Sequence, residues 1–294
     1  MKKVEQQELD EIIIRLTNAF VIEQVFLWAF DWDNIAYYML QILLKQQPNQ
    51  NLVEANIYLA SVVQRFEHIE FVICYPMEIK KKIRQGLGRP LLICQPGNLI
   101  YQHPQAKEPI KIPEHASETY IERTQLYIEK EHQKIHAFIE GYQFYLQKEH
   151  LGHAAFMLHQ VIELAFRAAE HLMVGEEKRT HRLRTHQDYV AKFSRQLGNL
   201  FRTNGRNSVI LQKLDEAYAA IRYEQDFKIK RRQLEVAGEL AATMLAWLNE
   251  YSLFLLKEMK EHLLSNSPYT VASPSHSSTM RGYVVRHHPT CFPC

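Results

Sequence analysis

Histidine is the residue type in this chain whose number first suggests chemistry. The 294 residues include 15 His but only 4 Cys. An imidazole can bind a metal ion or transfer a proton near neutral pH, so such a chain can be a metalloprotein or an acid–base enzyme. His159 and Glu163 are four residues apart, so a helix would place them on one face, with Arg167 one turn further along. That polar face predicts either a structural network or a ligand site.

The C-terminal segment HHPTCFPC contains the best match to a metal motif, because two residues separate its cysteines as in zinc sites. Its candidate ligands are His287, His288, Cys291 and Cys294. One terminal motif without a packed domain around it does not establish a metal site, so we expect no metal ion and no other cofactor.

The composition indicates a folded protein that does not cross a membrane. The chain has 35 Lys and Arg against 33 Asp and Glu, a net charge of +2, and 46% of its residues are hydrophobic. This content is enough to bury a core and argues against a wholly disordered chain. No apolar stretch approaches the ~18 residues that a membrane-spanning helix needs. The N-terminal segment MKKVEQQELDE turns acidic where a secretion signal turns apolar, so we expect a cytoplasmic protein.

The first hundred residues alternate between helical and strand-like patterns, which predicts a small α/β domain over residues 1–103. We expect helices at 4–20, 52–66 and 77–85, and strands at 24–30, 35–44, 69–75, 90–95 and 99–102. Three prolines then indicate a linker over residues 104–116.

The remainder of the chain has a helical period, and the fold class that we predict is therefore α+β. We expect helices at 117–148, 150–173, 185–201, 208–226 and 231–264, forming a bundle over residues 117–264. Residues 265–294 are rich in Ser, Pro, Thr and His, which predicts a disordered tail.

Three segments of the bundle carry a family resemblance. They are FMLHQVIELAFRAAEHLM at 156–173, THRL at 180–183 and LDEAYAAIRYEQDF at 214–227. In their order and spacing they resemble the HEPN domain, a helical module named from higher eukaryotes and prokaryotes nucleotide-binding. The matching positions are His159, Gln160 and Glu163 in the first segment, His181 in the second, and Tyr218, Arg222 and Tyr223 in the third. The resemblance covers residues 117–260 and implies a helical bundle that binds nucleotide or RNA and pairs as a homodimer.

Active HEPN domains resemble metal-independent RNases in which an Arg and a His, separated by four to six intervening residues, act together on the phosphate. After Arg222 the corresponding positions hold Phe227, Lys228 and Ile229, so the motif is absent where the resemblance requires it. Arg179 and His186 match the spacing in a connection between helices, and Arg281 and His287 match it in the tail. We therefore assign no catalytic residue. An RNase with a divergent site would use Arg222, Glu163 and His159 or His181.

The N-terminal region resembles a minimal nucleotidyltransferase domain in its order of helix, strand, strand, helix and strand. A working enzyme of that kind needs a Gly-Ser turn and a strand Asp-x-Asp that holds Mg²⁺. The turn here reads FDWDN, and Asp31 and Asp33 precede the second strand instead of lying on it. The region is thus predicted to keep the fold and lack the catalytic metal.

Basic residues gather in two segments. Residues 178–206 contain eight Lys and Arg against Asp188 alone, and Lys228, Lys230, Arg231 and Arg232 open the last helix. If the fold brings the segments together, they form a footprint for RNA or a nucleotide phosphate. The alternatives are a solvated surface and a docking face for an acidic partner. The binding candidates are Arg179, Arg182, Arg184, Arg222, Lys228 and Arg231.

The function that we predict is non-catalytic binding of nucleotide or RNA, in the toxin–antitoxin or stress-defence setting that the resemblance implies. The alternatives are the divergent RNase described above and a scaffolding protein. Aromatic residues on the first and last bundle helices are the candidates for a homodimer face. They are Tyr120, Tyr127, Phe138, Tyr142, Trp247, Tyr251 and Phe254.

Overall fold

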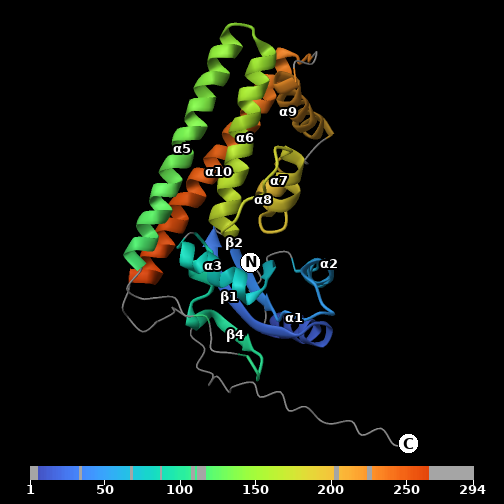
Figure 1. The fold of residues 1–294 in the computed structure, drawn as a ribbon, viewed down its shortest axis with the longest axis vertical. Helices are drawn as coiled ribbons and strands as arrows, with labels where there is room; N and C mark the ends of the chain where they lie inside the picture. The colour runs from blue at the N-terminus through green and yellow to red at the C-terminus, as the bar shows by residue number, and fades with distance from the viewer. Residues whose placement is uncertain are drawn as a thin grey trace, which may run out of the picture.

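The computed structural model describes most of the chain as a small mixed sheet attached to one end of a long helical bundle (Figure 1). The described residues are 6–32, 35–66, 69–86, 88–106, 110, 117–201, 205–223 and 227–264. The predicted α+β class is confirmed. Most of the predicted linker and the whole predicted tail, residues 265–294, lie outside the described residues.

The sheet has four strands in the order β3-β2-β1-β4. Strand β1 (Ile22–Trp32) pairs antiparallel with β2 (Ile35–Leu44) and with β4 (Leu99–Gln102). Strand β3 (Ile69–Cys74) pairs parallel with β2, because helix α2 (Leu52–Val63) crosses between them. Helix α1 (Gln6–Ala19) precedes the sheet, so the predicted order of helix, strand, strand, helix and strand is present and is compatible with the nucleotidyltransferase resemblance.

The two faces of the sheet contact different cores, as the alternation of side chains along a strand requires. In β2, Leu40 and Ile42 point into a core shared with α1 and α2. Met39 and Leu43, on the opposite face of the strand, point into a second core, which continues without interruption into the helical bundle. The sheet and the bundle therefore share one hydrophobic interior.

The run at 90–95 is a helix, and our prediction of a strand there is wrong. Helix α4 spans Pro90–Ile93 and follows helix α3 (Pro76–Gln85). All four of its residues are buried, so it lacks the polar face that distinguishes a helix in sequence. A proline at its first position suits a helix start and not a central strand.

The bundle consists of long helices that run side by side, with two short helices against one flank (Figure 1). The long helices are α5 (Ser117–Gln147), α6 (Leu151–Val174), α9 (Gly205–Tyr223) and α10 (Arg231–Leu264). The predicted helix at 185–201 is instead two helices, α7 (Leu183–Val190) and α8 (Arg195–Asn199). Ser194 starts α8 by accepting a hydrogen bond from the Leu197 amide, and Gly198 lets α8 fold back closely against Ala191. Among the described helices none has the length and apolar character needed to cross a membrane.

Candidate functional site

Glu163 of α6 is the centre of a polar cluster that joins all three motif segments. Its buried carboxylate lies 3.1 Å from Nδ1 of His181 and accepts a hydrogen bond from Gln160 at 3.2 Å. The Arg167 guanidinium lies one turn along the helix at 3.7 Å. His159, Glu163 and Arg167 therefore lie on one face of α6, as their spacing predicts, and the cluster gives the buried carboxylate the partners that it needs.

His159 is buried and both of its ring nitrogens have partners. Nε2 lies 2.9 Å from the carbonyl oxygen of His181, which can only accept, so Nε2 must carry the proton. Nδ1 lies 3.0 Å from the Gln160 amide nitrogen, which donates. Asp215 Oδ1 also lies 3.4 Å from Nε2, so both ring nitrogens of His159 are engaged by the protein and neither is left for a substrate.

His181 differs from His159 because its side chain is 57% exposed. Its Nδ1 faces Glu163, and its Nε2 makes no hydrogen bond to any residue in the described part of the chain. The Tyr218 ring stacks on both histidines, with centroids 4.7 Å from His181 and 4.8 Å from His159. Asp215, one turn before Tyr218 in α9, accepts a hydrogen bond from the Leu183 amide at 2.8 Å. Together these contacts fix the orientation of the His181 ring at the surface.

The second pair that matches the RNase spacing, Arg179 and His186, does not form a site. Arg179 is exposed, whereas His186 is fully buried. Nδ1 of His186 lies 2.8 Å from the Glu170 carboxylate and Nε2 lies 3.1 Å from the Thr180 carbonyl oxygen. Because both partners accept, the ring is a doubly protonated imidazolium. Burial lowers the pKa of His186, but the hydrogen bond and the charge of Glu170 outweigh it and raise the pKa overall. This pair is a buried structural link between α6 and α7.

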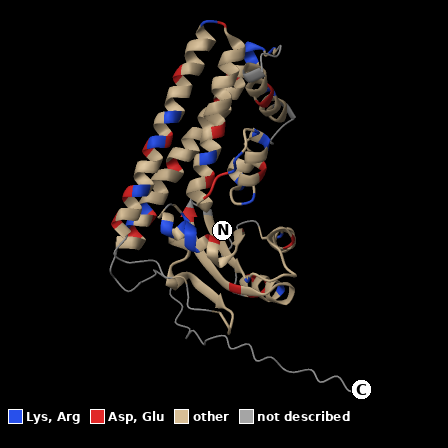
Figure 2. Ribbon diagram, viewed as in Figure 1, with Lys and Arg blue, Asp and Glu red and all other residues tan. Residues whose placement is uncertain are grey.

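The fold places the two basic segments at opposite ends of α9 (Figure 2). Arg179, Arg182 and Arg184 are exposed beside His181. Arg184 forms a half-exposed ion pair with Asp188 and donates a hydrogen bond to Ser208 near the start of α9. Lys228 follows the far end of that helix, which is about 28 Å long by helix geometry. Only the first segment therefore adjoins the motif cluster.

The remaining candidates lie apart from the cluster or outside the described part of the chain. Lys228 is exposed, and Arg231 is engaged by Glu149 and Glu235. The Arg222 side chain, and with it the expected pairing to Glu163, lies outside the described residues. So do all four tail candidates for metal, His287, His288, Cys291 and Cys294. In the described ranges no group of three or more His, Cys, Asp or Glu could hold a metal ion.

The aromatic residues that we expected at a dimer face lie mainly within the chain. Tyr120, Trp247 and Tyr251 are buried, and Phe254 packs on Trp28 and Phe30 of strand β1. Helical periodicity identifies an apolar face but not whether the sheet or a second subunit covers it. The large apolar side chains exposed on α5 and α10 are Leu126, Phe144, Leu253 and Leu264.

The sequence reasoning missed Glu170 and Asp215, which hold the THRL segment, and also Arg89 and Glu70 between the sheet and the bundle. Glu170 repeats the spacing of Glu163 two turns along α6, and this pattern could have identified it. Arg89 follows a Gly-Leu-Gly turn and precedes an apolar run, where a charged residue is unusual. Nothing in the local sequence shows that Arg89 meets Glu70, because that contact depends on tertiary structure.

Comparison with protein families matches residues 136–251 to the HEPN domain. The match runs from within α5 through most of α10 and includes the three motif segments. No curated protein matches the chain. Residues 136–251 of the helical region therefore match a HEPN domain.

Proposed function

We propose that this HEPN domain binds RNA or nucleotide without cleaving it, through the exposed cations beside His181. The observation that carries the proposal is the placement of Arg179, Arg182 and Arg184 at the surface next to the motif cluster. Exposed guanidinium groups bind phosphate oxygens by charge-assisted hydrogen bonds. His159 and His186 have both ring nitrogens engaged by the protein, so neither supports proton transfer to a ligand.

One observation favours the divergent RNase as a second candidate. The Glu163 carboxylate contacts Nδ1 of His181. The His181 ring is exposed, so its Nε2 faces solvent. This arrangement orients a histidine to act as a general base on a ribose hydroxyl, and the neighbouring Arg182 can stabilise charge on the phosphate. Binding and cleavage would then occur at the same surface. They can be separated by experiment, because binding depends on the arginines and cleavage would depend on His181.

The binding proposal is tested by fluorescence anisotropy with a labelled single-stranded RNA. We expect the affinity to fall as salt rises, and to fall by about tenfold or more in the double variant Arg182→Ala/Arg184→Ala, since each phosphate contact contributes to counterion release. The matched control is Arg15→Ala/Arg123→Ala, which removes two exposed cations from α1 and α5. Equal RNA affinity in the two double variants would show that this surface is not the RNA-binding site.

Cleavage is tested on the same RNA without added metal. The binding proposal predicts intact RNA at every time point. If the RNA is cut, the divergent RNase is supported when His181→Ala abolishes cleavage and leaves binding within about twofold. Cleavage that persists in His181→Ala would indicate another site or a contaminant, and would sink the assignment of His181.

The wider assignments are also part of this proposal. We infer a cytoplasmic homodimer in a toxin–antitoxin or stress-defence system, with an N-terminal domain of nucleotidyltransferase type that holds no catalytic metal. The family resemblance supports the setting, and the matching order of elements in the N-terminal region supports the domain type. Light scattering on the purified chain tests the dimer. A scaffolding role would be favoured if neither RNA nor nucleotide binds.

A further inference from the structure

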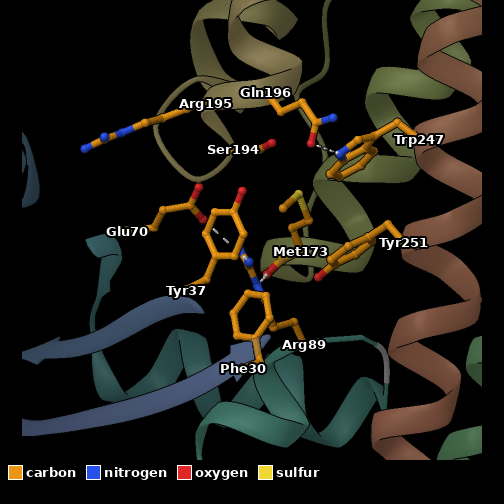
Figure 3. Close-up of a pocket in the computed structure, with 10 residues that line it drawn as sticks. All are labelled: Phe30, Tyr37, Glu70, Arg89, Met173, Ser194, Arg195, Gln196, Trp247 and Tyr251. Atoms are coloured by element: carbon orange, nitrogen blue, oxygen red, sulfur yellow. Dashed lines mark hydrogen bonds and ion pairs between the residues drawn. The ribbon is translucent and has the colours of Figure 1, made fainter. Parts of the chain in front are cut away.

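A small cavity lies where the sheet meets the helical bundle (Figure 3). It has a volume of about 40 Å³, more than the ~10–15 Å³ that one water molecule needs. Its walls come from β1, β2, β3, the start of α4, and helices α6, α8 and α10. None of the residues assigned above to RNA binding lines it.

Arg89 contributes a fully buried guanidinium to this cavity. The backbone amide of Arg89 donates to the Leu172 carbonyl oxygen at 2.9 Å, and its Nε donates to the Met173 carbonyl oxygen at 3.0 Å. These bonds anchor the residue at the C-terminal end of α6, where the helix dipole favours a cation. Nη1 and Nη2, in contrast, make no hydrogen bond to any residue that the structure describes.

Glu70 is the nearest anion, but its geometry leaves the guanidinium unsatisfied. Its Oε2 lies 3.9 Å from Nη1 of Arg89, which is an ion pair without a hydrogen bond. Burial raises the pKa of Glu70 to about 7, although the charges of Arg89 and Arg195 and the Arg195 amide oppose the shift. A buried guanidinium that lacks hydrogen bonds on two nitrogens is costly, so the cavity is built to receive an acceptor.

The cavity adjoins a larger groove, since Glu70 and Arg195 line both. The groove lies between α2, β3 and the α7–α8 region and has a volume of about 550 Å³, within the range of small-molecule sites. Lys192 and Arg195 outnumber Asp188 on its bundle side, and Phe71 lies on the sheet side. The two spaces together suit a ligand with an anionic end and an organic body.

We propose that the cavity binds the phosphate group of a small phosphorylated ligand at Arg89, and that the adjoining groove holds the organic part of the same molecule. A phosphate matches the two unsatisfied guanidinium nitrogens, which can donate to it in parallel. The hydroxyl groups of Tyr37 and Ser194 line the same cavity and supply further polar contacts. This site is separate from the proposed RNA surface and does not depend on it.

Calorimetric titration of the full chain with AMP, inorganic phosphate and adenosine tests the proposal. We expect AMP to bind at least about tenfold more tightly than either of its parts, because it alone fills both spaces. Adenosine binding as tightly as AMP would overturn the phosphate assignment. Phosphate binding as tightly as AMP would overturn the part assigned to the groove.

Two substitutions at the cavity then have opposite expected signs. Arg89→Met removes the anchoring cation and should weaken AMP binding by about tenfold or more. Glu70→Gln keeps the size of the side chain and removes a competing negative charge, so at about pH 8 it should tighten AMP binding by at least about threefold. The control Arg123→Met, at an exposed position of α5, should leave AMP affinity unchanged.

The two variants should change AMP affinity in opposite directions. The test therefore stays valid if Arg89→Met fails to fold, because Glu70→Gln still predicts a gain in affinity. A loss of affinity in Glu70→Gln would show that the site binds a cation or that the Arg89–Glu70 pair only joins the two halves of the chain, and either result overturns the proposal. Arg89→Met should retain RNA binding, so the failure of one proposal is distinguishable from the failure of the other.

Discussion

The histidines of the HEPN domain differ in what their ring nitrogens contact, and these contacts decide their roles. His159 is enclosed with both ring nitrogens engaged, His186 is enclosed and paired with Glu170, and His181 is oriented by a carboxylate but open to solvent. The sequence analysis placed His159 in the family motif and His186 in a match to the RNase spacing. It did not distinguish the environments of the two rings. Their protonation follows from partners on other segments, which the local sequence does not contain.

The His186–Glu170 pair gives a residue-scale prediction about pH. The folded state raises the pKa of His186 above its ordinary value of 6.5, so the stability that it contributes is present below pH 6.5 and is lost as the pH rises through the folded pKa. His186→Leu should lower the free energy of unfolding by about 3 kcal/mol at pH 6, because it leaves Glu170 buried without its cation. Urea denaturation of wild type and variant across pH 5 to 9 measures both effects.

Because Glu170 titrates differently once its cation is gone, the pH dependence is measured with the double variant His186→Leu/Glu170→Gln, which removes both titrating members of the pair. The stability gap between wild type and this double variant should narrow as the pH rises. His136→Leu is the matched control, since His136 is exposed on α5 and its loss should change stability by no more than about 0.5 kcal/mol. A gap that is constant across the pH range would mean that His186 is neutral in the folded protein.

At the scale of elements, the sequence predicted the long amphipathic helices and most strands closely, and failed at short buried pieces. Helix α10 has one apolar face and α6 is a long, mostly buried helix, so the helical period of each is readable over many turns. Helix α4 has four buried residues and α8 has five residues in all, too few for a period to appear. The structure of these pieces is set by what they pack against: α4 lies against α3, α10 and the sheet, and α8 lies against α7.

The turn before α4 gives an element-scale prediction. Gly88 has a positive φ of 68°, and a Cβ added there would lie 2.3 Å from the Leu172 carbonyl oxygen of α6. Gly88→Ala should therefore destabilise the protein by about 2 kcal/mol or more, since the turn must move away from the end of that helix. Gly97→Ala is the matched control, because a Cβ there meets nothing within 4 Å. Equal midpoints of urea denaturation for the two variants would show that the turn does not hold this close contact.

At the scale of the whole molecule, the predicted division into two sequence regions does not describe how the core is built. One face of the sheet, α3, α4 and the bundle form a continuous hydrophobic interior. Periodicity predicts which residues are buried but not which element covers them, and so the aromatic face of α10 was assigned to a dimer. In the structure Phe254 meets Trp28 and Phe30, with ring centroids 6.2 and 5.4 Å away.

A shared interior predicts that the sheet and the bundle unfold together. Phe254 projects from α10 onto strand β1, so Phe254→Ala should lower the free energy of unfolding of the whole chain by about 2 kcal/mol. The neighbouring Leu253 is 62% exposed, and Leu253→Ala should change stability by no more than about 0.5 kcal/mol. Tryptophan fluorescence reports partly on the sheet through Trp28, whereas far-ultraviolet circular dichroism reports mainly on the helices. Coincident transitions from the two probes, shifted together by Phe254→Ala, are expected for one cooperative unit. If the fluorescence transition alone shifts, the sheet and the bundle are independent folding units that only touch at this contact.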